Sequence, residues 1–102
     1  MVLLEFSMYP IAKGESVSPY VARCLEIVEQ SGLDYRCHAT STTIEGNIDQ
    51  VMEVVRRCFD ALAMDCDRIE CNVRMDYRKG PPGRLEANVA SVEQKLGHAL
   101  KK

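Results

Sequence analysis

Residues 67–78 read DRIECNVRMDYR, and from Ile69 to Tyr77 every second residue is apolar. The residues between them carry charges or an amide group. A period of two is the pattern of a β-strand with one buried face and one polar face. We therefore expect a long strand here, whose polar face is open to water or lines something polar. The function depends on which of these two holds.

The length and composition predict a single domain over residues 1–102. Hydrophobic residues make up 46% of the chain and charged residues 27%, which is ordinary for a globular protein with one core. A chain of this size buries only about two thirds of its unfolded surface, so association of subunits would add stability.

The charge disfavours two classes of partner. A net charge of −2 gives no general attraction to a phosphate backbone, so we expect no nucleic-acid partner. No apolar run reaches the roughly 18 residues of a membrane span, and residues 1–4 lack the basic flank of a signal peptide. We therefore expect a cytoplasmic protein without a membrane partner.

The five cysteines are an odd number, and no two have the spacing C-x-x-C. Most fall at apolar positions of predicted elements, which is typical of small core side chains in a reducing cytoplasm. Cys66, Cys71 and His38 are conceivable metal ligands, but their spacing matches no zinc module. We favour core thiols and expect no metal.

Hydrophobic periods, caps and breaks predict seven elements. Asn47 is a helix cap, with Gln50 at the third helical position as in a capping box. Ser18 before Pro19 predicts the start of an earlier helix. The elements are a strand over 2–9, a helix over 19–31, a hairpin of strands over 35–39 and 43–45, a helix over 47–64, the strand from Ile69, and a third helix after the glycine- and proline-rich break at 79–83.

This order is β-α-β-β-α-β with an added C-terminal helix. It predicts an α+β, ferredoxin-like fold, in which two helices cover one face of an antiparallel sheet and leave the other uncovered. The first and third strands are central in such a sheet. Glu5, Ser7, Thr43 and Glu45 should then lie near the middle of the uncovered polar face.

Three explanations of this polar face stay open. Its carboxylates can face water, pair with Arg36 or Arg74 across strands, or meet a cationic ligand. The third helix carries an apolar stripe that needs a partner, either the edge of this sheet or another subunit. An associating subunit would cover the polar face and turn it into the wall of a cavity, which is a common kind of ligand site.

Four stretches carry a family resemblance. Residues 2–11 (VLLEFSMYPI), 18–21 (SPYV), 42–46 (TTIEG) and 73–78 (VRMDYR) resemble the YkoF-like thiamine-binding family. The resemblance covers essentially the whole chain. It implies a ferredoxin-like fold whose subunits form homodimers or homotetramers. It also implies binding of thiamine, or of its hydroxymethylpyrimidine part, without catalysis.

The chemistry of thiamine suits the polar face. A carboxylate such as Glu45 can hydrogen-bond the aminopyrimidine, and Glu5 or Asp76 can offset the positive thiazolium. Tyr9 or Tyr77 can offer an aromatic face to the cation, although core packing is the simpler role for both. The expected ligand-binding residues are Glu5, Ser7, Thr43, Glu45, Arg74 and Asp76. The hydroxyls would donate hydrogen bonds, and the arginine would orient the carboxylates.

Other readings of the chain remain. A structural or regulatory oligomer without a small-molecule ligand would use the polar faces only for pairing between subunits. In that case Glu45→Ala changes the mass of the assembly rather than ligand binding. His38 is the first candidate for a catalytic residue. No nucleophile lies in a recognisable motif, however, so we expect that the protein is not an enzyme. The polar face lacks the aromatic residues of an RNA-recognition module, and residues 11–18 lack the glycine-rich anion loop of an acylphosphatase.

Overall fold

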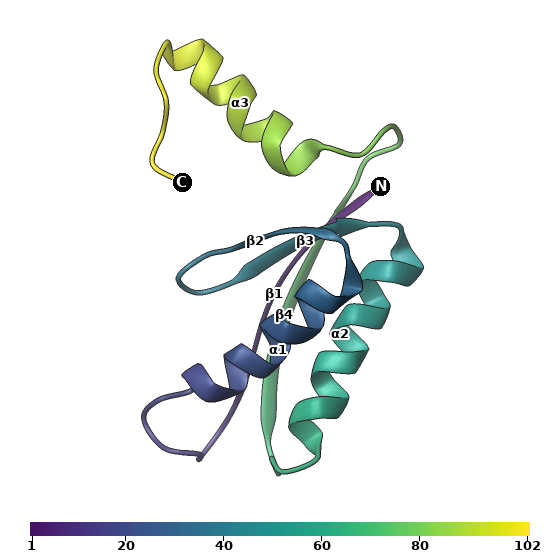
Figure 1. Cartoon of the computed structure of the whole chain (residues 1–102), viewed down its shortest axis with the longest axis vertical. Helices are drawn as coiled ribbons and strands as arrows, with labels where there is room; N and C mark the ends of the chain where they lie inside the picture. The colour runs from purple at the N-terminus through teal and green to yellow at the C-terminus, as the bar shows by residue number, and fades with distance from the viewer.

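Seven elements follow one another in the order β-α-β-β-α-β-α, which confirms the ferredoxin-like prediction and its C-terminal helix (Figure 1). The computed structural model describes the whole chain, Met1–Lys102. The elements are β1 (Val2–Pro10), α1 (Ser18–Ser31), β2 (Asp34–Cys37), β3 (Thr42–Gly46), α2 (Ile48–Ala63), β4 (Ile69–Tyr77) and α3 (Arg84–Leu96).

The four strands form one antiparallel sheet in the order β2-β3-β1-β4, with β1 and β3 in the centre as predicted. In this register Glu5 lies between Thr43 of β3 and Arg74 of β4. Leu3 lies in the same way between Glu45 and Asp76. The predicted polar side chains therefore share one face of the sheet.

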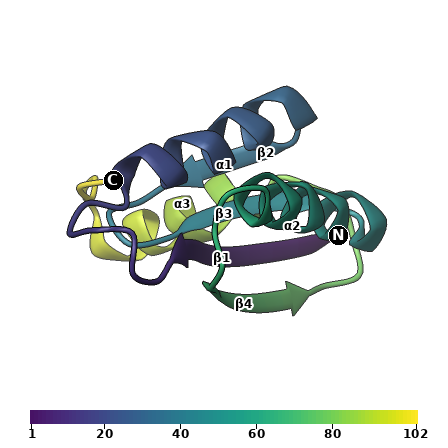
Figure 2. The ribbon, with the colours of Figure 1, turned by 90° about the horizontal axis from the view of Figure 1, so that it is seen from below.

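The core lies between the sheet and the two helices α1 and α2, which cover the same face (Figure 2). Alternate residues of β1 and β3, including Leu4 and Ile44, point into it and are fully buried. They meet Val28 of α1 and Val51 and Leu62 of α2, all of which are also fully buried. Each buried leucine or isoleucine side chain contributes about 1.5–3 kcal/mol through its removal from water.

Of the two helix caps predicted from the sequence, one is confirmed and one is wrong. The capping box is confirmed, because Asn47 and Gln50 each accept the other's backbone N–H at 2.9 Å. The predicted cap at Ser18 is wrong: Ser18 is the first helical residue, and Val17 precedes the helix without a side-chain cap bond. Pro19 lies in the first turn, where its missing N–H costs nothing.

The apolar face predicted for β4 is not buried. Ile69 is half-buried, but every later residue of the strand is exposed, up to 70% for Tyr77. The reason is that β4 is an edge strand and the helices pack mainly against the centre of the sheet. One row of α2 side chains is exposed too. We call these apolar residues of β4 and α2 the edge surface: Val73, Met75, Tyr77, Ile48, Met52 and Phe59.

The helix α3 stands apart from α1 and α2 and contacts β2 and β3 (Figure 1). The carboxylate of Glu45 accepts the backbone N–H of Gly83 at 2.8 Å and that of Arg84 at 3.1 Å. The Arg84 guanidinium bonds the Asp76 carboxylate at 3.0 Å, and it also donates to the backbone carbonyls of Asp76 and Met1. We call these contacts the α3 anchor.

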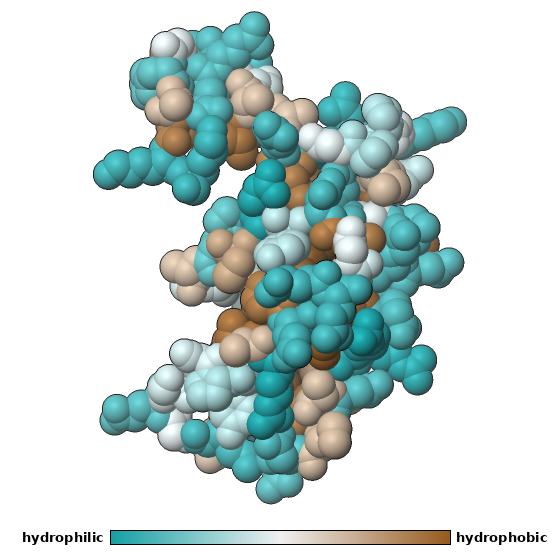
Figure 3. Space-filling model, viewed as in Figure 1, coloured by the Kyte–Doolittle hydropathy of each residue, from teal (hydrophilic) through white to brown (hydrophobic).

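The apolar stripe of α3 is only partly covered. Figure 3 shows apolar side chains gathered where α3 meets the rest of the molecule. Leu85 and Val89 are half-buried, whereas Val92 and Leu96 near the end of the helix are exposed. The anchor at the first turn therefore does most to fix the position of α3.

Loss of the Glu45 carboxylate is expected to free α3. The side chain is only 3% exposed, so Glu45→Ala leaves two backbone donors without a partner, at a cost of about 1–3 kcal/mol each if they stay buried. Amide hydrogen exchange should show faster exchange in α3 and unchanged protection in α1 and α2. Glu70→Ala, on exposed β4, is the control and should leave α3 unchanged. Equal protection of α3 in both variants would contradict the anchor.

The pH dependence of one ion pair gives a second prediction. Arg23 of α1 grips Asp65 through two hydrogen bonds of 2.8 Å, which hold the pKa of this carboxyl at about 2 instead of 3.8. Because the folded-state pKa is the lower one, the pair stabilises the fold above about pH 4, and this contribution is lost as the pH falls towards 2. An NMR titration of Asp65 should give the low midpoint, and Arg23→Gln should return it towards 3.8. A wild-type midpoint already near 3.8 would disprove the effect.

Candidate functional site

The structure divides the six predicted ligand-binding residues among three places. Glu5, Ser7 and Arg74 line one hollow of about 160 Å³ on the open face of the sheet. Thr43 lies in a separate cleft beneath α3. Glu45 and Asp76 belong to the α3 anchor, where their oxygens already accept hydrogen bonds.

Glu5 is the acidic group of the hollow. It is exposed on the central strand β1, and its carboxylate accepts a hydrogen bond from the Ser41 hydroxyl at 3.2 Å. Arg74 lies opposite Glu5 in the strand register, yet the four ion pairs of the structure do not include either residue. The negative charge of Glu5 is therefore available to a cation.

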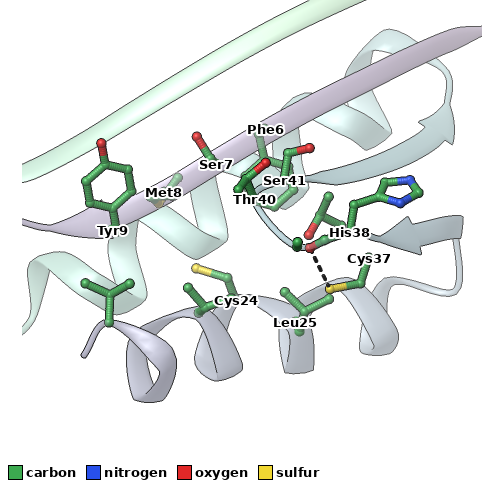
Figure 4. Close-up of a pocket in the computed structure, with 14 residues that line it drawn as sticks. Phe6, Ser7, Met8, Tyr9, Cys24, Leu25, Cys37, His38, Thr40 and Ser41 are labelled. Atoms are coloured by element: carbon green, nitrogen blue, oxygen red, sulfur yellow. Dashed lines mark hydrogen bonds between the residues drawn. The ribbon is translucent and has the colours of Figure 1, made fainter. Parts of the chain in front are cut away.

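A larger groove of about 520 Å³ adjoins the hollow (Figure 4). It runs between α1 and the end of β1 and is closed on one side by the connection from β2 to β3. We call it the hairpin groove. Most of its wall is apolar, with Val21 and Leu25 of α1 facing Phe6 and Met8 of β1. Polar groups lie mainly at its rim, as hydroxyls of β1 and of residues 40–42.

The hairpin groove and the hollow are neighbouring cavities that share lining residues. Phe6, Ser7 and Ser41 line both of them, so the apolar groove ends at two hydroxyls, with Glu5 just beyond. Such a site can take a flat, neutral ring in the groove and a positive group in the hollow. Three residues of the polar half, Glu5, Ser7 and Arg74, are among those predicted from the sequence pattern. Ser41 and the apolar groove were missed, because α1 and the hairpin meet only in the folded chain.

The cleft beneath α3 has a volume of about 600 Å³ and a mixed lining. Arg36 and Thr43 come from the sheet, His38 from the connection between β2 and β3, and Glu86 and Asn88 from α3. Its shape depends on the position of α3 and thus on the α3 anchor. We regard it as secondary to the groove, since five of its 13 lining residues are hydrophobic, against nine of 14 in the groove.

His38 and Cys37 are the titratable side chains of the groove contributed by the connection after β2 and by the end of β2. The His38 side chain points away from the centre of the groove (Figure 4). Cys37 beside it donates a weak hydrogen bond of 3.8 Å to the His38 carbonyl, and no hydrogen bond joins the His38 ring to a hydroxyl or thiol. No group of three histidine, cysteine or acidic side chains is arranged to hold a metal ion.

The helices of the structure are all too short or too polar to cross a membrane.

The fold has solved counterparts. A hypothetical protein of Methanocaldococcus jannaschii superimposes with a TM-score of 0.83 at 27% identity, covering 91% of this chain and 96% of that one. A protein of Thermotoga maritima, named as a candidate thiamine biosynthesis or salvage protein, superimposes with a TM-score of 0.78 at 21% identity, covering 89% and 97% of the two chains. The second likeness establishes the fold alone.

Relatives in sequence agree with this. A UPF0045 protein of Synechocystis is 34% identical over 93 residues, which is 90% of this chain and 77% of that protein. A UPF0045 protein of Mycobacterium bovis is 35% identical over 96 residues, which is 93% of this chain and 94% of that protein. Residues 4–93 match the thiamine-binding protein family. The expected family is thus confirmed: this chain belongs to the family described as thiamine-binding protein.

Proposed function

We propose that the protein binds thiamine, or its hydroxymethylpyrimidine part, without changing it chemically, and does so as a homo-oligomer. The observation that carries the proposal is Glu5, a carboxylate without a cationic partner, at the mouth of an apolar groove. Membership of the thiamine-binding family supports the choice of ligand.

The two halves of thiamine suit the two halves of the site. The aminopyrimidine is flat and uncharged, and the apolar hairpin groove offers it about 520 Å³, within the usual range of roughly 300–1,000 Å³ for ligand pockets. Ser7 and Ser41 at the rim would hydrogen-bond its edge. The thiazolium would lie in the hollow, where Glu5 offsets its positive charge.

The remaining predicted residues have more distant roles in this proposal. Arg74 lines the hollow and would orient the Glu5 carboxylate. Thr43 would act from the neighbouring cleft. Glu45 and Asp76 would act through α3, because their oxygens are engaged in the α3 anchor.

The edge surface supports association into a homodimer or homotetramer. β4 is nine residues long, pairs with a strand only on one side, and has apolar side chains beside its free edge. A free strand edge of this kind pairs readily with another chain. A two-fold axis would place β4 against the β4 of a second copy, because the same patch then meets itself. The cytoplasm, where the five free thiols would stay reduced, suits such a protein.

A structural or regulatory oligomer without a ligand is the second candidate function. The edge surface favours it, since this surface suits association whether or not a ligand binds. The two candidates differ in what Glu5 does, because a purely structural role gives this carboxylate no cation to meet.

Calorimetric titration should therefore show heat with thiamine and with hydroxymethylpyrimidine, and mass spectrometry should recover both ligands unchanged. Glu5→Gln is expected to weaken the binding of thiamine about tenfold or more, which corresponds to about 1.4 kcal/mol for a lost charge-assisted contact. The binding of hydroxymethylpyrimidine should change little, because that molecule lacks the cation. Glu70→Gln, an exposed carboxylate at the far end of β4, is the matched control. Absence of heat at millimolar ligand would favour the structural candidate.

Charge on the edge surface should dissociate the oligomer. We expect analytical ultracentrifugation of the wild type to give the mass of two or four chains. Met75→Lys places a cation among exposed apolar side chains of β4 and should give the monomer. Met64→Lys, at a side chain that is also exposed but follows α2, should leave the mass unchanged. The same mass for all three proteins would place the interface elsewhere.

A further inference from the structure

Two thiols meet in the core between α1 and α2. Cys24 is buried in the middle of α1, and Cys58 is buried in the second half of α2. The Cys58 thiol donates a hydrogen bond of 3.6 Å to the backbone carbonyl of Cys24. The Cys58 sulfur therefore reaches the backbone of the opposite helix, so the two residues are close neighbours.

The two thiols have different acidity. The neighbouring Cys58 thiol lowers the pKa of Cys24, and the neighbouring Cys24 thiol, together with burial, raises the pKa of Cys58 well above its ordinary value. The thiolate is the reactive form of cysteine. Cys24 is therefore the better nucleophile of the pair, and Cys58 is the thiol that keeps its proton.

The hairpin groove gives small molecules a path to Cys24. Cys24 lines the groove, and its sulfur points from α1 towards β1 (Figure 4). The side chain is only 2% exposed, so a small reagent can approach through the groove whereas a bulky one cannot. Cys58 is fully buried and does not line the groove.

We propose that Cys24 and Cys58 are a reactive dithiol, which hydrogen peroxide entering through the hairpin groove oxidises to a disulfide between α1 and α2. Transient bridges of this kind are the usual form of cytoplasmic disulfide. The inference stands independently of the ligand, because it uses the groove only as a path.

The reaction balances in two steps. The Cys24 thiolate attacks one peroxide oxygen; the S–O bond forms as the O–O bond breaks, and the leaving hydroxide takes up a proton to become water. Cys24 is then a sulfenic acid. The sulfur of Cys58 attacks the Cys24 sulfur; the S–S bond forms, the S–O bond breaks, and the hydroxide leaves as water with the Cys58 proton. In total, two thiols lose two hydrogens and one peroxide is reduced to two waters.

The test uses the full chain with Cys37→Ser and Cys71→Ser, because these two thiols are exposed and would react first. After peroxide treatment of the folded protein, intact mass should fall by about 2 Da, for two lost hydrogens, and peptide mapping should join Cys24 to Cys58. Dithiothreitol should restore the mass. Tm should be higher in the oxidised form, since the bridge restricts the unfolded chain.

Two further variants separate the roles of the thiols. With Cys58→Ala, no second thiol is left to attack the oxidised Cys24 sulfur. Peroxide should then add oxygen to Cys24 instead of removing hydrogens from the protein. Cys66→Ser is the control, because that thiol bonds Asp65 outside the pair, and the bridge should form as before. If Cys24 is bridged to another cysteine in the protein with Cys37→Ser and Cys71→Ser, or if peroxide leaves this folded protein unbridged, the proposal is overturned. Circular dichroism checks that each variant has folded, and the peptide map of the Cys37→Ser, Cys71→Ser protein decides the matter without any core variant.

Discussion

The strand β1 connects the core to the site, because its alternation sends neighbouring residues to opposite faces of the sheet. Leu4 and Phe6 point into the core, and Glu5 and Ser7 point to the open face. β1 also pairs with both β3 and β4, so it sets the register of the whole sheet. A slip of one residue would bury Glu5 and expose Phe6, which the core does not allow. The hydrophobic core therefore determines where the carboxylate of the site lies.

Local patterns predicted most of the fold, and contacts between distant residues account for what they missed. Asn47 and Gln50 are three residues apart, so their capping box can be read directly from the chain. The exposure of β4 depends on which strands the helices cover, and alternation alone says nothing of that. The role of Glu45 depends on Gly83 and Arg84, which are far along the chain. The hairpin groove depends likewise on how residues 38–41 lie against α1.

Part of the sequence resemblance has a structural explanation. In the block Thr42–Gly46, the Glu45 carboxylate holds the start of α3 by accepting hydrogen bonds from the backbone amides of Gly83 and Arg84. Gly46 is close to the side chain of Gln50, so that a Cβ at this position would lie 3.0 Å from the Gln50 amide oxygen. That oxygen completes the cap of α2. The block thus positions two helices, whereas the proposed ligand contacts come mainly from β1 and Ser41.

The anchor of α3 has a consequence for how copies of the chain can assemble. Two carboxylates and one guanidinium hold this helix, and the link to it, residues 78–83, contains two glycines and two prolines. The Nε atom of Arg84 is buried without a partner, so even the anchor is not fully satisfied. A neighbouring molecule offers an identical receptor for the same helix. Exchange of C-terminal arms between two copies of the chain would therefore cost little, since every bond broken in one molecule would be remade in the other.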